Sequence, residues 1–300
     1  MTIQIRKAQQ SDAEKIARLY IRVYNGNYSL KEYTAPDSIK KIIIDRKYIW
    51  YIAHHEKDVI GSAVGVIEKW NKSFEIGRTV VDNNFSNKGI GTALCENITK
   101  HAFKNGLNIQ WGTLRDIAIY NIAKKLDMTV VGYLPGLHKP KKRETHLMTL
   151  RISQNAKNKR ISVGNPIYTL PYVKKIIENF GLEDVKGEYP QETIVGPESN
   201  RTATFKTQYH QGDNSTIITS ADKFFASSDY LQVTLLADKT DAIRFFEKLG
   251  FEMCAFLPAW FEKDRKRYDC VLMANPIQEP SAHDKTLEEM VKEIKSGFRK

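Results

Sequence analysis

The first half of the chain alternates between two patterns of hydrophobic and polar residues. Short segments of alternating, β-branched or aromatic residues are typical of strands, and they take turns with segments whose apolar residues recur every three or four positions, as in amphipathic helices. This alternation favours a mixed α/β fold over a helical bundle or a β-sandwich. Strands are predicted at residues 3–7, 48–53, 59–67, 74–81, 107–114, 128–134 and 144–151, and helices after Asp12, over 36–44, after Gly91 and over 116–126. A break at Pro135-Gly136 is expected to separate the last two strands.

The second half of the chain contains an internal repeat of the first. Residues 246–259 line up with residues 123–136 at an offset of 123, and this register continues without a gap into the flanking strand-like segments. The segment between the two copies is rich in serine, asparagine, lysine and glycine, has little to bury, and is expected to be a linker. The predicted organisation is a first domain at 1–151, a linker at 152–165 and a truncated second copy at 166–300 that ends in a helix over 285–298.

Composition and charge narrow the class of protein. With 41% apolar residues the chain has enough material for a folded core, and 46 basic against 35 acidic residues leave a net charge of +11. No apolar run reaches the roughly eighteen residues of a membrane-spanning helix, and the start of the chain lacks a secretory signal. Cys95, Cys254 and Cys270 are far apart and have no second cysteine at metal-ligand spacing, which predicts reduced thiols and no metal site. We therefore expect a cytoplasmic protein.

The positive charge is compatible with nucleic acid, an anionic membrane surface or an anionic small ligand. The basic residues gather at 139–143 and at 157–160. Neither cluster is interleaved with the aromatic residues that stack on single-stranded nucleic acid. We therefore expect neither nucleic acid nor a membrane as a partner.

One segment joins a strand to a helix through two glycines. After the strand that ends at Val81, a polar loop leads to Gly89 and Gly91 at the start of an amphipathic helix. Glycines let the backbone approach a ligand, and unpaired N–H groups at the positive end of a helix dipole favour an anion such as phosphate, with Lys88 adding charge. The alternative is that the glycines only permit a tight turn and close helix packing. A dinucleotide fingerprint is excluded because Leu94 stands at its third glycine position, and a P-loop motif is absent.

The residues around these glycines resemble a known family. Val-Asp-x-x-Phe at 81–85, Lys-Gly-Ile-Gly-Thr-Ala-Leu at 88–94 and Lys-Lys-Leu-x-Met at 124–128, with the order of strands and helices over 3–151, are similar to the GNAT superfamily of acyl-coenzyme-A-dependent N-acyltransferases. Through the repeat, the resemblance extends less closely to residues 210–274. It implies a central, mostly antiparallel sheet flanked by helices, followed by a truncated second copy of the same fold.

The resemblance also implies where coenzyme A binds. The family signature, R/Q-x-x-G-x-G/A, holds the pyrophosphate through backbone amides, and here Ser86 replaces the opening Arg or Gln. This replacement predicts weaker binding, for which Lys88 is the candidate compensation. Backbone N–H groups near Val80 and Val81 are expected to polarise the thioester carbonyl, and Asp116 falls where the family often has an asparagine that touches the coenzyme. The implied binding residues are Val80, Val81, Ser86, Asn87, Lys88, Gly89, Ile90, Gly91, Thr92 and Asp116.

For catalysis the resemblance implies a general base and a general acid. Glu75, eleven residues before Ser86, stands where the family often has a catalytic glutamate, and the alternative is a solvated charge at the strand edge. Alternation along the strand predicts that Arg78 points to the opposite side from Glu75. The family's usual acid is a tyrosine, which Ala123 replaces here. Tyr120, one helical turn earlier, is either the nearest substitute or a buried aromatic residue of the helix.

The second copy is not expected to share this chemistry. Its residues 209–214 correspond to 86–91, and Asp213 would repel a phosphate group there. The second copy is expected instead to cover the amine site, to pair its sheet with that of the first copy, or to mimic a dimer partner.

Together these features predict an N-acetyltransferase that moves an acetyl group from acetyl-CoA to a primary amine by direct attack on the thioester, without a metal. The net positive charge suits an anionic coenzyme and would repel polyamines, which favours a neutral or zwitterionic small-molecule acceptor. The alternative is a catalytically weak or inactive module that binds or senses acyl-CoA, and a basic nucleic-acid binder is a third interpretation. We expect a monomer or a homodimer.

Overall fold

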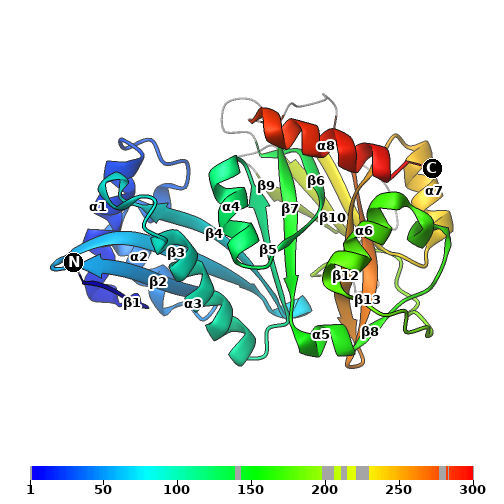
Figure 1. Cartoon of the computed structure of the whole chain (residues 1–300), viewed down its shortest axis with the longest axis horizontal. Coiled ribbons are helices and arrows are strands. Elements are labelled where there is room, and N and C mark those ends of the chain that lie inside the picture. The colour runs from blue at the N-terminus through cyan, green and yellow to red at the C-terminus, as the bar shows by residue number, and fades with distance from the viewer. Residues whose placement is uncertain are drawn as a thin grey trace. The chain divides into compact units, whose positions relative to one another are not determined.

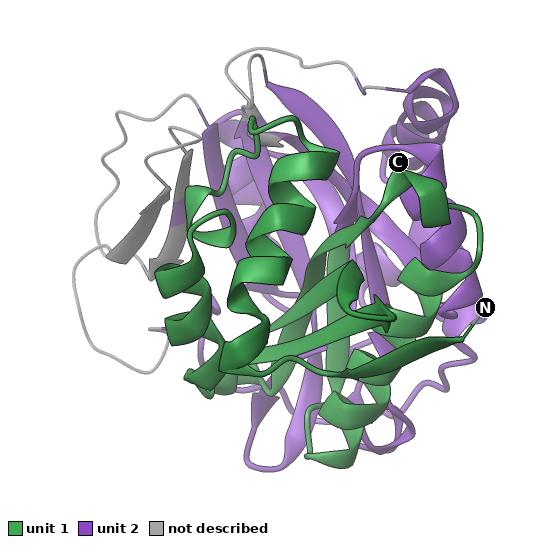
Figure 2. Cartoon of the chain, turned by 90° about the vertical axis from the view of Figure 1, so that its left-hand side faces the viewer, with its two compact units in different colours: residues 1–112 green, residues 113–300 purple. Residues whose placement is uncertain are grey.

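The computed structural model of the chain describes residues 2–138, 143–197, 206–210, 215–220, 230–276, 282 and 284–299. The chain forms two compact units, residues 1–112 and residues 113–300 (Figure 2). Among the helices of the described ranges, none has both the length and the apolar character that crossing a bilayer requires. Single turns of 3-10 helix lie at Gln10–Asp12, Lys31–Tyr33, Lys69–Asn71, Asn83–Phe85 and Pro166–Thr169.

The first unit is built on a sheet whose strands follow the order of the chain. Its strands are β1 (Ile3–Lys7), β2 (Tyr48–His55), β3 (Asp58–Glu68), β4 (Ser73–Val81) and the start of β5 (Ile109–Leu114). Neighbouring strands are antiparallel from β1 to β4, and β5 runs parallel to β4. The mostly antiparallel sheet that the family resemblance implied is confirmed.

Helices cover both faces of this sheet (Figure 1). They are α1 (Ala13–Val23), α2 (Pro36–Ile44) and α3 (Ile90–Lys104). On β2, Trp50 belongs to the core beneath α1 and α2, whereas the next residue, Tyr51, contacts His101 of α3, since successive strand residues point to opposite faces. Close packing of α3 requires Gly65 in β3, because a Cβ atom there would lie 2.8 Å from a side-chain carbon of Ile98.

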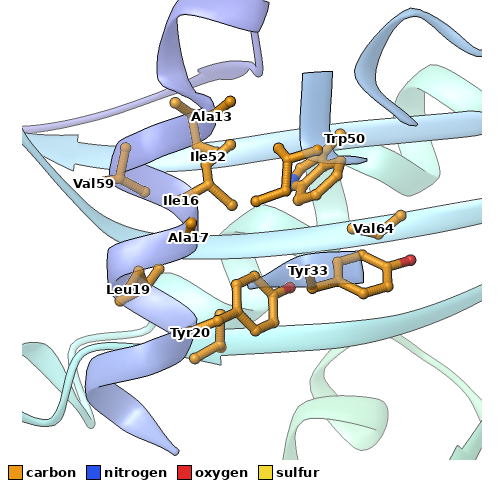
Figure 3. Close-up of a cluster of buried hydrophobic side chains, with 12 residues drawn as sticks. Ala13, Ile16, Ala17, Leu19, Tyr20, Tyr33, Trp50, Ile52, Val59 and Val64 are labelled. Carbon is orange, nitrogen blue, oxygen red and sulfur yellow. The ribbon is translucent and has the colours of Figure 1, made fainter. Parts of the chain in front are cut away.

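The core beneath α1 follows the helical spacing seen in the sequence. Ile16, Ala17, Leu19 and Tyr20 are buried on one side of α1 and pack with Trp50 and its neighbours on the sheet (Figure 3). Burial of one large aliphatic side chain contributes about 1.5–3 kcal/mol. This packing holds α1 against β2, β3 and β4.

The second unit has its own strands and helices. The helices are α4 (Ile117–Lys125), α5 (Gln154–Asn158), α6 (Pro171–Phe180), α7 (Thr240–Lys248) and α8 (Lys285–Gly297), and the strands are β6 (Thr129–His138), β7 (Glu144–Ile152), β8 (Arg160–Ile161), β9 (Lys206–His210), β10 (Ser215–Ser220), β11 (Tyr230–Leu236), β12 (Glu252–Lys263) and β13 (Lys266–Pro276). The strand order is β7-β6-β12-β13-β11-β10-β9, with β8 beside β13. Helix α8 confirms the predicted C-terminal helix.

The elements of the second copy recur at the predicted offset. Helix α7 begins and ends 123 residues after α4, and β12 begins 123 residues after β6. Both strands shift register at matching places, between Val130 and Gly132 in β6 and between Met253 and Ala255 in β12. The two strands pair antiparallel through Gly132 and Ala255, which are themselves related by the offset. Of the three roles considered for the second copy, sheet pairing is therefore observed.

This pairing depends on a glycine. A Cβ atom at Gly132 would lie 2.1 Å from the carbonyl oxygen of Cys254, so a residue with a side chain does not fit where the repeated strands meet. Membership of the second copy in the same family stays a prediction. Residues 211–214, where its phosphate cradle is predicted, and residues 139–142 of the basic cluster lie outside the described residues.

The predicted break at Pro135-Gly136 is wrong. Strand β6 continues through these residues to His138 and stays paired with β7. Gly136 has a φ of 77°, and the pairing shifts register between Pro135 and His138. A bulge in a continuous strand thus accounts for the proline and glycine that suggested a turn.

The expectation that residues 152–165 have little to bury is also wrong. This segment contains α5 and β8, and Arg160 is only 1% exposed. The Arg160 guanidinium bonds both carboxylate oxygens of Asp269 on β13 at 2.6–3.1 Å. A buried arginine is tolerated when its charge is paired in this way, and no local pattern indicates so distant a partner. The domain limits at residues 151 and 165 stay predictions.

Candidate active site

The connection from β4 to α3 is held in one shape by its own side chains. The carboxylate of Asp82 accepts a hydrogen bond from the backbone N–H of Asn84 at 3.0 Å and pairs with Arg22 of α1 at 2.6 Å. The hydroxyl of Ser86 donates to the backbone carbonyl of Asn83 at 2.7 Å. The loop therefore enters α3 at a defined position, and the Ser86 hydroxyl is used in making its turn.

The start of α3 leaves backbone N–H groups available. Gly89 is the N-cap residue, with a φ of 75°, and no side chain of the described residues caps the helix. A Cβ atom on Gly89 would meet no other described part of the chain within 4 Å, so the space beside it is open. Unpaired N–H groups at the positive end of a helix dipole suit an anion. The residues predicted to hold a pyrophosphate, Ser86 to Thr92, thus form one continuous segment with the right polarity.

Neighbouring residues of the predicted coenzyme site differ in exposure. Lys88 is exposed, and its ammonium lies 5.0 Å from the centre of the Phe85 ring, which keeps a positive charge beside the start of α3. Asn87 has a left-handed backbone with a φ of 60°, which asparagine tolerates better than most residues. Val80 is buried and Val81 is half-buried at the end of β4. The contacts of these residues with a coenzyme stay predictions.

The predicted residues of α4 belong to the second unit. Asp116 is the N-cap of α4, and its carboxylate accepts a hydrogen bond from the backbone N–H of Ile119 at 3.0 Å. Tyr120 is half-buried, with the ammonium of Lys124 5.8 Å from its ring centre. Ala123, at the family's tyrosine position, is buried. The roles of Asp116 and Tyr120 toward a coenzyme stay predictions.

Strand β4 carries an irregularity between Gly77 and Val80. These two residues pair with Val64 and Ser62 of β3, so three steps along β4 face two steps along β3. The extra residue makes a β-bulge, and within it Arg78 has a φ of 51°, a left-handed conformation that strains a residue with a side chain. Bulges re-aim side chains and are over-represented beside active sites.

The bulge brings Arg78 to Glu75. The guanidinium Nη1 lies 2.6 Å from Glu75 Oε2, so the prediction that the two side chains point to opposite sides is wrong: the extra residue shifts the alternation by one position. Burial disfavours the charged guanidinium, yet the carboxylate of Glu75 keeps the pKa of Arg78 above its usual value. The Glu75 side chain is 23% exposed, and Glu75 pairs with Val66 of β3 and Trp111 of β5, so it does not lie at a sheet edge.

A group of tyrosines from α1 and the segment after it contacts the bulge through Tyr20. The hydroxyl of Tyr20 donates to the backbone carbonyl of Arg78 at 2.6 Å. Tyr20, Tyr24, Tyr28 and Tyr33, here called the tyrosine cluster, have ring centroids 4.5–6.4 Å apart, and Figure 3 shows Tyr20 and Tyr33 side by side. Burial raises the pKa of Tyr33 to about 12, and the Arg78 charge opposes this rise for both Tyr28 and Tyr33. Through Tyr20, which packs on both Tyr28 and Tyr33, the cluster is joined to the backbone of Arg78.

Sequence reasoning did not single out Arg78 or the tyrosine cluster as site residues. The four-residue spacing of Tyr20, Tyr24 and Tyr28 is a signal that could have found part of the cluster, because it continues one helical face past the end of α1. No comparable signal marks the bulge, since residues 73–81 show an ordinary strand pattern.

The described residues also contain a cavity and three cysteines outside the predicted site. A cavity of about 400 Å³ in the second unit is lined by α7, α8 and β12 and contains no residue of the predicted site. No group of three or more His, Cys, Asp or Glu side chains within the described ranges is arranged to hold a metal ion. Cys95, Cys254 and Cys270 are buried free thiols, and burial raises the pKa of Cys95 to about 11.

Comparison with known proteins bears on the N-terminal part of the chain. Residues 13–123 match the model of the Acetyltransferase (GNAT) family. Among solved structures, the chain is similar to the ribosomal-protein-S5-alanine acetyltransferase of Vibrio fischeri, with 17% identity, a TM-score of 0.47, and 51% of this chain and 94% of that chain covered. It is also similar to a GNAT-family acetyltransferase of Streptococcus pneumoniae, with 16% identity, a TM-score of 0.45, and 51% and 99% covered.

No curated protein matches the chain in sequence. The family match nevertheless covers β4, α3 and the connection between them, together with the tyrosine cluster and Arg78. It confirms the resemblance found in the sequence, and the chain therefore carries a domain of the GNAT acetyltransferase family at residues 13–123.

Proposed function

We propose that the chain is an N-acetyltransferase that moves an acetyl group from acetyl-coenzyme A to the primary amine of a small molecule. The observation that carries the proposal is the uncapped start of α3 within a segment that matches the acetyltransferase family. The domain at 1–151 holds both substrates in this proposal, and the second copy at 166–300 does not bind the coenzyme.

The α3 segment fits the diphosphate of coenzyme A in charge and in shape. The backbone N–H groups of Ile90, Gly91 and Thr92 open the helix without a capping side chain from the described residues and would donate to phosphate oxygens. Gly89 leaves room for the ligand, and the Lys88 ammonium offsets part of its charge. When bound, acetyl-coenzyme A supplies a thioester whose carbonyl carbon accepts the amine nitrogen while the sulfur departs as a thiolate.

Glu75 is the proposed general base. A primary amine has a pKa of about 10 and is an ammonium ion at neutral pH, so it must lose a proton before it can attack. Glu75 Oε2 is bonded to Arg78, whereas Oε1 has no hydrogen-bond partner among the described residues. Oε1 is therefore available to accept the proton, directly or through one water. The hydrogen bond from Arg78 holds the carboxylate in place.

Tyr120 is the proposed general acid for the departing thiolate. It is half-buried on α4, one turn before the position where the family usually has its tyrosine. A thiolate is a fair leaving group without protonation, so loss of this acid is expected to slow the reaction and not to abolish it. Backbone N–H groups near Val80 and Val81 are the proposed donors to the carbonyl oxygen.

Substitution of Glu75 by glutamine tests the base. We expect Glu75→Gln to lower kcat/KM for thiol release at pH 7 by about 100-fold, the lower end of the range for a general base. The deficit should shrink above pH 9, because more of the acceptor is already neutral there. The measurement is a pH profile from pH 6 to pH 10 with saturating acetyl-coenzyme A.

Glu14→Gln is the matched control, since Glu14 is an exposed residue of α1 that pairs with Arg18 on the same helix. The control should follow the wild-type profile. Both variants should bind coenzyme A as the wild type does, which separates a catalytic loss from a folding defect. Superimposable profiles of wild type and Glu75→Gln would remove Glu75 from the mechanism.

A second candidate function is a module that binds or senses acyl-coenzyme A without efficient transfer. It is favoured by two hydrogen bonds: the Ser86 hydroxyl is used within its own loop, and the Asp116 carboxylate within its own helix. Isothermal titration combined with a thiol-release assay on a panel of amines separates the two functions. Coenzyme binding with release supports the transferase, and binding without release supports the module.

A further inference from the structure

This inference rests on the proposed function and concerns the acceptor. From the Glu75–Arg78 pair and the tyrosine cluster we infer that the acceptor is an α-amino acid or a close relative with a free carboxylate and an apolar or aromatic side chain. Arg78 binds the carboxylate and thereby selects the substrate. Four observations in the first unit lead to this assignment.

The first observation is the strained backbone of Arg78. Its φ of 51° lies in the left-handed region, which glycine adopts without penalty and arginine does not. The neighbouring residue along the bulge, Gly77, is a glycine, yet the left-handed position is held by the arginine. The hydroxyl of Tyr20 fixes this conformation by bonding the Arg78 carbonyl at 2.6 Å. Strain held in this way by surrounding packing is characteristic of functional sites.

The second observation is the unused hydrogen-bonding capacity of Arg78. A guanidinium has five N–H donors, and in Arg78 only Nη1 has an acceptor among the described residues, the Glu75 carboxylate at 2.6 Å. The side chain is 22% exposed, so its other donors are only partly hydrated. A planar fork of donors matches a carboxylate better than any other small anionic group of metabolites except phosphate.

The third observation is the placement of opposite charges. Glu75 and Arg78 present a carboxylate and a guanidinium side by side, on the same side of β4, because of the bulge. An α-amino acid carries an ammonium and a carboxylate on one carbon. Its ammonium can face Glu75, which the reaction requires in order to remove a proton, while its carboxylate faces the open donors of Arg78. An amine without an anionic group leaves those donors unfilled.

The fourth observation is the tyrosine cluster. Tyr20, whose hydroxyl bonds the Arg78 carbonyl, packs on Tyr28 and Tyr33 with ring centroids 5.0 and 5.6 Å away, which places the cluster at the bulge. The Arg78 charge opposes the rise in pKa that burial causes in both phenols. Tyr24 is 38% exposed and packs on Tyr28 with centroids 4.5 Å apart, which extends the aromatic surface toward solvent. Such a surface suits the apolar side chain of an amino acid.

The experiment compares three acceptors that share one aromatic side chain: phenylalanine, phenylalaninamide and 2-phenylethylamine. For the wild type we expect kcat/KM for phenylalanine to exceed that of each carboxylate-free amine by at least about 100-fold, because a site built to bond a group rejects the analogue that lacks it. The amide has a less basic amine, more of which is neutral at pH 7. A preference for phenylalanine over the amide therefore cannot arise from amine ionisation.

Two variants assign the preference to Arg78. In Arg78→Met, the ratio of kcat/KM for phenylalanine to kcat/KM for each carboxylate-free amine should fall to within about threefold of one. Arg78→Lys keeps the charge without the planar fork, so its ratio should lie between those of the wild type and Arg78→Met. Arg18→Met, which removes an exposed arginine of α1, is the matched control and should keep the wild-type ratio. A wild-type ratio near one, or a ratio that persists in Arg78→Met, overturns the inference.

A binding measurement keeps this inference separable from the proposed function. Calorimetric titration of phenylalanine and of 2-phenylethylamine into the wild type saturated with coenzyme A reports acceptor recognition without turnover. Tighter binding of phenylalanine that is lost in Arg78→Met supports the inference even where no amine releases thiol, an outcome that would defeat only the proposed transferase. Equal binding of the two ligands, or binding of neither, overturns the inference whether or not transfer occurs.

Discussion

Helices α3 and α4 each follow a strand of the chain, and their first turns are built in opposite ways. Helix α3 follows β4 and begins at Gly89, where no side chain of the described residues caps the backbone N–H groups. Helix α4 follows β5 and begins at Asp116, whose carboxylate accepts the N–H of Ile119. The family resemblance assigned both helix starts to the coenzyme. The structure distinguishes them. The first backbone N–H groups of α3 have no capping side chain among the described residues, whereas one N–H group of α4 is already bonded by Asp116.

The difference follows from residue type. Glycine at an N-cap has no side-chain oxygen to offer, and its left-handed backbone here directs the chain away from the helix start. Aspartate at an N-cap bonds a backbone N–H and adds a negative charge where the helix dipole is positive. Each choice has a consequence that a single substitution can reveal.

The largest effect is expected from placing a carboxylate at the start of α3. Gly89→Asp should weaken coenzyme A binding by at least about 100-fold, because a like charge a few ångströms from a diphosphate costs several kcal/mol at the effective dielectric of a protein surface. Gly89→Asn has the same shape without the charge and tolerates the left-handed backbone, so it should lose much less affinity. Calorimetric titration of coenzyme A measures both variants. Equal affinity of Gly89→Asp and wild type would refute the phosphate site at α3.

A smaller effect, of a different kind, is expected at α4. Asp116→Ala removes the N-cap and should lower the free energy of unfolding by about 1 kcal/mol, within the range of about 0.5–2 kcal/mol for such caps. Asp116→Asn keeps an oxygen that can cap the helix and should be close to wild type. Urea denaturation followed by circular dichroism measures the change. Coenzyme affinity should not fall in either variant. A large loss of coenzyme A affinity without a change in the free energy of unfolding would mean that the start of α4 also binds the coenzyme.

The sequence could predict those features that depend on residues close together in the chain. The helix spacing of Ile16, Leu19 and Tyr20, and the glycines of the β4–α3 loop, act within a few residues, and the elements they indicate are present. The fold class follows from such local patterns together with the family resemblance.

What could not be predicted depends on contacts between distant residues. The bulge at Arg78 is set by its pairing with β3 and by the hydroxyl of Tyr20, 58 residues away in sequence. The burial of Arg160 depends on Asp269, 109 residues away. In both cases an arginine lies in an ordinary local pattern. Its left-handed backbone or its burial depends on a partner far away in the sequence.

The repeat gives a further example within the second unit. The offset of 123 residues correctly indicated which elements correspond, since α7 and β12 begin where the offset places them. It did not show that β6 and β12 pair with each other through Gly132. Edge-to-edge pairing of the copies needs a glycine at the meeting point, but glycines within strands are also common at bulges and sharp bends. Gly132 alone therefore does not indicate the pairing.

The smallest effect is expected from the exposed charge beside α3. Lys88→Gln should weaken coenzyme A binding by about two- to fivefold at low salt, because an exposed ion pair contributes no more than about 1 kcal/mol. The difference between wild type and variant should nearly vanish at about 1 M salt, where the Debye length falls to about 3 Å. Lys88→Arg keeps the charge and should match the wild type at every salt concentration. A loss in Lys88→Gln that does not change with salt would indicate that the lysine acts through its packing on Phe85. The amides of α3 alone would then account for the site's attraction to a diphosphate.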